Sequence, residues 1–264
     1  MFAKSLEIIK INMKTTLAYI TTAWGALFTT LLQVFVFYYI WMAIYKEDSI
    51  INGISREQII TYIIFSRIIY TQLTWGFISR IGSKIQTGSI VMDMLKPIDF
   101  QLYIYLGRLG DFILFGMLTS VPILIICGLT LGIQLPSSPI IFVYFFLSLF
   151  LATTISFFVE FWIGLLTFYT NFSWGLQTFQ ESLISLFSGA LIPLSFFPKW
   201  LLIITNLLPF KEMSYSPVAI YLGLIHGREI IETLIFQVMW VFILLILSRL
   251  FYSFVIKKVT VQGG

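Results

Sequence analysis

The stretch from Thr15 to Tyr45, TTLAYITTAWGALFTTLLQVFVFYYIWMAIY, decides the fold class of this chain. It contains no Asp, Glu, Lys or Arg. About 20 helical residues cross the hydrocarbon core of a bilayer, so the stretch is long enough for a full span. It is also far longer than the apolar part of a cleavable signal peptide, and no small-residue cleavage pattern follows it. We expect a retained membrane-spanning helix.

The rest of the chain has the same apolar character. Hydrophobic residues make up 59% of its 264 positions and charged residues 11%, whereas a soluble domain carries about 25% charged residues. So few charges cannot cover so much apolar surface in water. Barrel strands would alternate polar and apolar residues, and these runs do not. The sequence therefore predicts an all-α, polytopic membrane helical bundle that forms one domain over residues 1–264.

Six transmembrane helices are expected from the apolar runs, at 18–44, 59–79, 112–133, 140–168, 172–192 and 231–255. With the N-terminus in the cytoplasm, ten Lys and Arg residues, Arg108 among them, lie on the cytoplasmic side and five on the outer side. This bias follows the positive-inside rule. Both termini are therefore expected in the cytoplasm, and the protein in the cell membrane.

Residues 1–17 are predicted to form an amphipathic helix ahead of the first span. Its apolar residues recur at helical spacing, and its lysines lie off that stripe; the stripe consists of Phe2, Leu6, Ile9, Met13 and Leu17. A basic helix of this kind lies in the plane of the membrane interface. The alternative is a simple extension of the first span.

The chain lacks the residues that most catalytic and metal sites need. Cys127 is the only cysteine and His226 the only histidine, so neither an internal disulfide nor a zinc or haem site is expected. The dispersed acids offer no nucleophile-and-base set. A phosphate-binding loop needs the dipeptide Gly-Lys, which the sequence does not contain. We expect no enzyme activity, no metal and no bound cofactor in this chain, and its dispersed basic residues argue against nucleic acid as a partner.

The loop at 80–111, between the second and third spans, is predicted to hold a short helix at the cytoplasmic face. Gly88 is expected to end the preceding helix, Ser89 to cap the short one and Asp99 to cap the next. Pro97 stops the short helix. Its apolar side is expected to comprise Ile90, Val91, Met94 and Leu95.

Such a helix suits docking into a groove of another protein. The candidate contact comprises Ser89, Ile90, Val91, Asp93, Met94, Leu95, Lys96 and Pro97. The alternative is a helix that lies on the lipid surface and contacts no partner.

Residues 193–228 are predicted to form an outer helical hairpin between the fifth and sixth spans. Four of the eight prolines fall there and divide the apolar sequence into pieces too short for a span. The candidate outer lid consists of Pro193, Phe197, Pro198 and Trp200. The alternative is a segment that merely covers the bundle.

Three charged residues, Arg67, Glu160 and Glu181, fall inside predicted spans. A charge at the centre of a bilayer costs about 3 kcal/mol, so such residues face a bundle interior or a wet cavity. Both glutamates are expected at a similar depth, within reach of Arg67. We predict a cluster of Arg67 with one or both glutamates, which is either part of a pathway or a fixed structural ion pair.

Two segments of the sequence resemble a known family. Gly88–Ile90 together with Leu95–Phe100 is similar to the cytoplasmic coupling region of ABC transporter permeases of the type-2 exporter class. Ser188–Pro193, Phe196–Pro198 and Leu208–Phe210 resemble the outer hairpin of the same class. The resemblance extends to the layout of the whole chain.

This resemblance implies the permease subunit of an ATP-driven exporter, paired with a second permease that is identical or a sibling. Two separate ATPase subunits, which hold ATP and Mg, would bind from the cytoplasm and receive residues 89–95 in a cleft. ATP-driven closure would switch the permease pair between inward-open and outward-open states. A self-standing secondary transporter or channel is the alternative, but it would need an internal repeat and helices broken at mid-membrane. The substrate is left open.

Overall fold

The computed structural model describes residues 2–17, 20–46, 50–170 and 172–258. Within these ranges, the strands β1 (Ile50–Ile51) and β2 (Ile54–Ser55) form a short antiparallel hairpin. The remaining elements are helical: α1 (Phe2–Leu17), α2 (Ile20–Tyr45), α3 (Arg56–Leu73), α4 (Phe77–Gln86), α5 (Ile90–Met94), α6 (Phe100–Phe115), η1 (Gly116–Ser120), α7 (Val121–Thr130), α8 (Pro139–Leu165), α9 (Thr167–Thr170), α10 (Ser173–Phe187), η2 (Leu194–Phe196), α11 (Lys199–Leu207), α12 (Lys211–Leu222), α13 (Arg228–Val255) and η3 (Ile256–Lys258).

Four helical stretches of the described chain are long and apolar enough to cross a membrane: Ile20–Tyr45, Phe100–Thr130, Pro139–Thr170 and Arg228–Val255. They leave large apolar side chains uncovered, since Phe28, Leu129 and Phe242 are 66%, 84% and 61% exposed. Such surfaces are stable where hydrocarbon covers them, because their contact with water is unfavourable. The predicted class of helical membrane bundle is confirmed.

The second, third and fifth predicted spans differ from their expected bounds. Residues 59–79 are divided between α3 and α4, with a break at Gly76, whose φ is +55°. α3 has 18 residues and α10 has 15, which correspond to about 27 and 22 Å of helix. The third span begins at Phe100, because α6 continues through the π-helical segment η1 into α7. A helix that begins after Asp99 and leads through Arg108 into the span was predicted, but the span itself was placed from residue 112 because Arg108 and Asp111 interrupt the apolar run.

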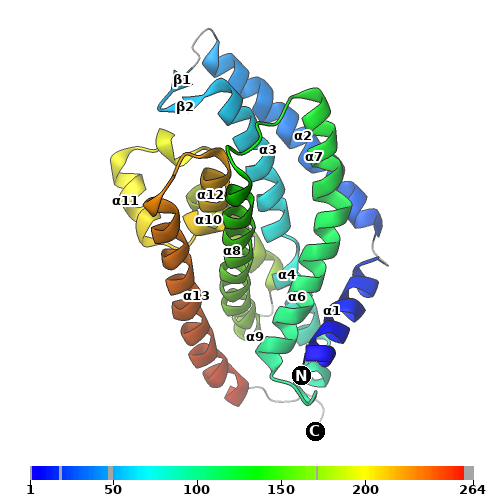
Figure 1. Cartoon of the computed structure of the whole chain (residues 1–264). Helices are drawn as coiled ribbons and strands as arrows, with labels where there is room; N and C mark the ends of the chain where they lie inside the picture. The colour runs from blue at the N-terminus through cyan, green and yellow to red at the C-terminus, as the bar shows by residue number, and fades with distance from the viewer. Residues whose placement is uncertain (1, 18–19, 47–49, 171, 259–264) are drawn as a thin grey trace.

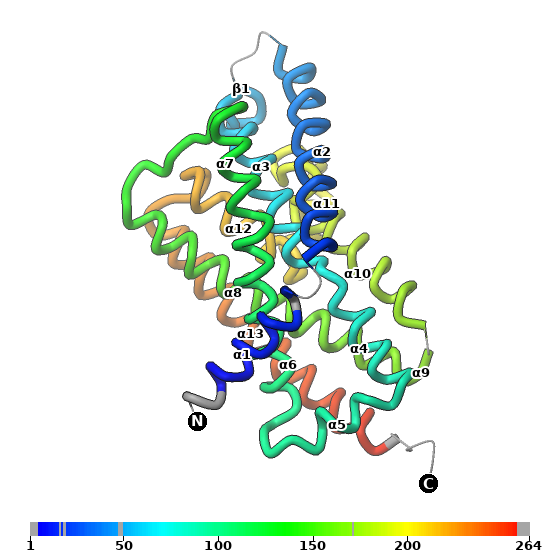
Figure 2. Tube along the Cα trace, turned by 90° about the vertical axis from the view of Figure 1, so that its right-hand side faces the viewer, coloured from blue at the N-terminus to red at the C-terminus, as the bar shows by residue number. Residues whose placement is uncertain are grey.

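The long helices α2, α3, α6 with α7, α8 and α13 run roughly along one axis (Figure 1). α1, α5 and the C-terminal end of α13 lie at one end of the bundle, and the β1–β2 hairpin lies at the other (Figures 1 and 2). α8 passes through the middle, where it packs most extensively against α13 and α12. Its residues from Ala152 to Phe161 are buried and form much of the core.

α1 packs along α6, and a glycine allows the close approach. A Cβ added at Gly110 would lie 2.7 Å from the carbonyl oxygen of Ile9. Any larger residue at position 110 would therefore push α1 away from the bundle.

Candidate functional site

The segment predicted to contact a partner is α5 with its flanking turns, at the same end of the molecule as α1 (Figure 2). Gly88 follows α4 with a φ of +71°, and Asp99 accepts a hydrogen bond from the backbone N–H of Leu102 at 2.8 Å. Both turn predictions are confirmed. Ser89 does not cap α5 as predicted, because its hydroxyl is hydrogen-bonded to that of Thr87 at 2.9 Å.

The apolar side of α5 faces inward, contrary to its predicted role as the contact. Ile90 is 3% exposed, and the partly buried Val91 and Met94 also pack against the core. The exposed apolar side chains are Met92 at 68% and Leu95 at 73%. Three of the predicted contact residues therefore anchor the helix, while Met92, which the sequence analysis left out, points outward.

A buried carboxylate fixes α5 to its neighbours. The two oxygens of Asp93 accept hydrogen bonds from Lys84 Nζ of α4 at 2.6 Å and from Lys96 Nζ at 2.7 Å. Burial alone would raise the pKa of Asp93, but the bonds from both lysines lower it below its ordinary value. Asp93 therefore keeps its charge at neutral pH, and the stability that these bonds contribute is lost only as the pH falls through the lowered pKa.

A buried ion pair joins α6 to α8. Arg108 donates from Nε to Glu160 Oε2 at 3.0 Å and from Nη2 to Glu160 Oε1 at 3.2 Å. Nη2 also donates to the backbone carbonyl of Gln72 on α3 at 2.9 Å. Arg108 was predicted to lie in the cytoplasmic loop, but its side chain is 6% exposed and that of Glu160 is 1% exposed.

In the described part of the chain, Arg67 makes no direct hydrogen bond or ion pair with Glu160 or Glu181, the partners predicted for it. Tyr70 neighbours both Glu181 and Arg67, whose guanidinium carbon lies 5.5 Å from the Tyr70 ring centroid. The guanidinium of Arg67 donates to the backbone carbonyl of Ala190 and lies 4.3 Å from the centroid of the Phe37 ring. Arg67 thereby holds the turn after α10 against α3. Glu160 is occupied by Arg108, on the helix that the sequence analysis placed outside the membrane.

Glu181 lies instead in a polar groove on the side of the bundle. Its Oε1 accepts a hydrogen bond from Gln177 Nε2 at 2.8 Å. The groove has a volume of about 340 Å³ and is lined by Tyr70 of α3 and by Thr178, Glu181, Ser182, Ser185 and Leu186 of α10. Hydroxyl and carboxylate groups at the surface of a helix need water or a polar partner, since lipid tails satisfy neither.

α4 connects the α5 segment to this groove. The backbone N–H of Ser79 donates to Gln177 Oε1 at 3.0 Å, so Gln177 bonds both to α4 and to Glu181. Gly82, one helical turn further along α4, lies directly against Ser173 at the start of α10. The Lys84–Asp93 bond, α4 and the Ser79–Gln177 bond thus form a continuous series of contacts from α5 to α10.

We expect Gly82→Ala to destabilise the protein by about 1–3 kcal/mol, because overpacking forces side chains and backbone apart. An added Cβ would lie 2.2 Å from Ser173 Cβ. The matched control is Gly25→Ala on α2, where an added Cβ meets no atom within 4 Å. Thermal unfolding in detergent compares the two variants, and an equal midpoint for both would contradict the close α4–α10 contact.

The predicted outer segment divides into two different helices. α11 lies at the surface, with Trp200 64% and Leu207 70% exposed. α12 instead inserts between α8 and α3, and its residues Val218–Ile220 are fully buried. The proline pattern predicted short helices but could not reveal that the second one belongs to the core.

Of the predicted lid residues, Pro193 is buried, Phe197 is partly buried, and Pro198 and Trp200 are exposed. The neighbouring Phe196 of η2 packs edge-on against Trp41 of α2, with ring centroids 4.8 Å apart. The start of the outer segment is thus fixed to α2, while Trp200, Ile203 and Leu207 of α11 are exposed at the surface.

Comparison with known proteins identifies the family of the chain. Residues 9–263 match the sequence profile of a family described as ABC-2 family transporter protein. No curated protein sequence matches the chain significantly. The match covers nearly the whole chain and agrees with its apolar helices and with the segments that resemble the coupling region and outer hairpin of such permeases. The chain therefore belongs to the ABC-2 family of transporter proteins, whose members are the transmembrane permease components of ABC transporters.

Proposed function

We propose that the chain is the membrane subunit of an ATP-driven exporter. Two permeases, identical or siblings, would enclose the pathway, and two separate ATPase subunits holding ATP and Mg would bind from the cytoplasm. ABC-2 permeases work with ATPase subunits, so the family match supports this arrangement. The sequence contains no phosphate-binding Gly-Lys motif, in agreement with an ATPase on another chain.

In this proposal the chain makes six passes, with both ends in the cytoplasm. The proposed passes are α2, α3 with α4, α6 to α7, α8, α10 and α13. Each turns back near the end where the previous one finishes (Figures 1 and 2). The end that carries α1 and α5 also holds Lys84, Lys96 and Arg249, as expected of a cytoplasmic face. In this arrangement α1 is the interfacial helix, and α11 with Pro193, Phe197, Pro198 and Trp200 forms the outer lid.

The single observation that carries the proposal is a pair of exposed apolar side chains, Met92 of α5 and Leu95 directly after it. The opposite side of this short helix packs against the rest of the chain. Met92 and Leu95 are 68% and 73% exposed, whereas the opposite side of α5 is fixed by Ile90 and Asp93. Apolar anchors on a rigid base suit insertion into a cleft of a partner protein. Within the segment 89–97 we therefore assign the ATPase contact to these two side chains.

Closure of the ATPase would move α5 and, through the Lys84–Asp93 bond, α4. Because Ser79 of α4 is bonded to Gln177, this motion would tilt α10 and change the polar groove around Glu181. We propose that the groove is part of the substrate pathway. The buried pair Arg108–Glu160 and the buried Arg67 hold the surrounding helices in place.

Purification of the protein in mild detergent from its native membrane tests the exporter assignment. The expected result is a co-purified ATPase in equal stoichiometry whose hydrolysis rate changes when the permease is removed. Transport into sealed vesicles that contain the permease and no ATPase would contradict the proposal and favour a self-standing transporter.

Thiol labelling tests whether water reaches the groove. In a Cys127→Ser background, we expect Ser182→Cys to react with a water-soluble maleimide at least about tenfold faster than Phe242→Cys, because hydrocarbon excludes the reagent and suppresses thiolate formation. Both positions are exposed at the surface of the single chain, Ser182 in the groove on α10 and Phe242 on α13. Equally slow reaction at both positions would show that the groove is closed to water.

A further inference from the structure

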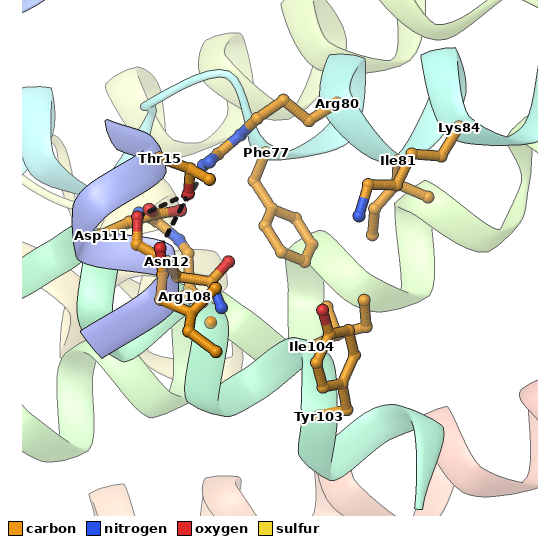
Figure 3. A pocket seen from close by; sticks show the side chains of 12 residues that line it. Asn12, Thr15, Phe77, Arg80, Ile81, Lys84, Tyr103, Ile104, Arg108 and Asp111 are labelled. Carbon is orange, nitrogen blue, oxygen red and sulfur yellow. Dashed lines mark hydrogen bonds and ion pairs between the residues drawn. The ribbon is translucent and has the colours of Figure 1, made fainter. Parts of the chain in front are cut away.

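A second cleft lies on the other side of α4, between α1, α4 and α6. It has a volume of about 410 Å³. Figure 3 shows the side chains that surround it, contributed by all three helices. The cleft shares Lys84 with the proposed coupling between α5 and α4, but its lining includes neither Met92 and Leu95 nor the residues of the groove around Glu181.

One part of the cleft wall is basic. Arg80 and Lys84 of α4 line it, as does Arg108 of α6, which is paired with the buried Glu160; Asp111 is the lining carboxylate. Arg80 bonds to Asp111 and Lys84 to Asp93, both at 2.6 Å, yet 46% of the Arg80 side chain and 44% of the Lys84 side chain remain exposed. Their positive charges therefore stay accessible to a ligand.

The surroundings of the cleft keep an excess of positive charge after these pairs are counted. Asp93 serves two lysines, because Lys96 also bonds to it at 2.7 Å. α1 adds the exposed Lys10 and Lys14 against the exposed Glu7. An anion that enters from the α1 side would meet this excess before it reached Arg80.

The other part of the wall is apolar. Phe77 and Ile81 of α4, Ile104 of α6 and Ile11 of α1 line the cleft. α1 also leaves Ile11 and Leu17 55% and 44% exposed. Exposed apolar residues together with lysines are typical of a helix in the membrane interface, where lipid headgroups and the first methylene groups lie.

We propose that this cleft binds the headgroup of an anionic phospholipid. The phosphate would lie between Arg80 and Lys84, and the start of the acyl chains would lie against Phe77 and Ile104. Basic pockets between membrane helices on the cytoplasmic side recognise anionic headgroups in this way. A water-soluble phosphate ester would leave the apolar wall uncovered, so the lipid is the ligand that fits both parts of the wall.

Thr15 offers a test that leaves the ion pairs intact. It lines the cleft from α1, its side chain is exposed, and its hydroxyl donates to the carbonyl of Asn12 at 2.7 Å within the same helix. Thr15→Glu places a negative charge in the cleft, and Thr15→Gln places a neutral group of nearly the same shape there. One charge near a basic lipid site changes affinity about fivefold, so Thr15→Glu is expected to retain about fivefold less anionic lipid than Thr15→Gln.

The measurement is native mass spectrometry of the detergent-purified protein with phosphatidylglycerol or phosphatidylcholine at equal concentration. The proposal expects phosphatidylglycerol to be retained in preference to phosphatidylcholine, and the preference to be lost in Thr15→Glu but kept in Thr15→Gln and in the remote control Lys199→Gln. Equal retention of both lipids by the unaltered protein would overturn the proposal, as would identical behaviour of the two Thr15 variants. Displacement of the bound lipid by millimolar glycerol phosphate would overturn the assignment to a lipid in favour of a soluble phosphate.

Discussion

Replacing both Met92 and Leu95 by aspartate is expected to detach the ATPase from the permease and to leave the membrane fold intact. The two side chains are 68% and 73% exposed in the single chain, so the fold does not depend on them. Burial of a Met or Leu side chain contributes about 1.5–3 kcal/mol, and a carboxylate in the same apolar contact is unfavourable. The affinity for the ATPase should therefore fall at least about a hundredfold. The amount of ATPase that co-purifies per permease measures this loss.

Two controls separate loss of the contact from loss of the fold. Ile50→Asp, at the opposite end of the molecule, changes a side chain that is 65% exposed and should retain the ATPase. Ile90→Asp should instead lower the yield of folded permease, because Ile90 is 3% exposed and packs in the core. Full retention of the ATPase by the Met92 and Leu95 double variant would show that the contact lies elsewhere.

Arg108→Met is expected to cause one of the largest losses of stability among single substitutions, about 3–5 kcal/mol, because it leaves the carboxylate of Glu160 buried without its partner. Glu160 is 1% exposed, and both of its oxygens accept bonds from Arg108. Thermal unfolding in detergent measures the change.

The matched controls use the same substitution in other settings. The double variant Arg108→Met, Glu160→Met should recover most of the lost stability, because no unpaired charge remains. Arg228→Met removes a cation whose side chain is 90% exposed and whose partner Glu232 is 60% exposed, so we expect a change within about 0.5 kcal/mol. Equal destabilisation by Arg108→Met and Arg228→Met would contradict the buried position of the pair.

The sequence predicted the membrane class and the turns, because each depends on local properties. Long uncharged runs require hydrocarbon around them. Gly88 suits a positive φ, and Asp99 caps the helix that follows it. The same local criteria began the third span at residue 112, inside the continuous helix that starts at Phe100, because Arg108 and Asp111 interrupt the apolar run.

The partners of the charged side chains could not be predicted in this way. Depth along a helix was estimated from residue counts, but the side of the helix on which a charge lies depends on packing between helices. Glu160 therefore bonds to Arg108 rather than to Arg67. One feature of the sequence could have indicated this pair: Arg108 lies within the largely apolar stretch 104–115. A charge surrounded by apolar residues in a helix favours a buried partner of opposite charge.

The predicted orientation of α5 differs from the observed one for a related reason. The most apolar side of α5 was predicted to face the partner, yet Ile90, Val91 and Met94 pack against the core and fix this five-residue helix to its own protein. The spacing of Met92 and Leu95, three residues apart, would have predicted a second apolar side. A helix as short as α5 is stable only through such tertiary contacts.

Site-specific photocrosslinking from position 95 in intact cells tests the central claim most directly. A photoreactive phenylalanine analogue at Leu95, which is 73% exposed, should form a covalent link to the ATPase subunit. The same analogue at Ile50 should not. Our account would be contradicted if position 95 gave no such link and if Leu95→Cys, in a Cys127→Ser background, reacted with a membrane-impermeant thiol reagent added outside the cell.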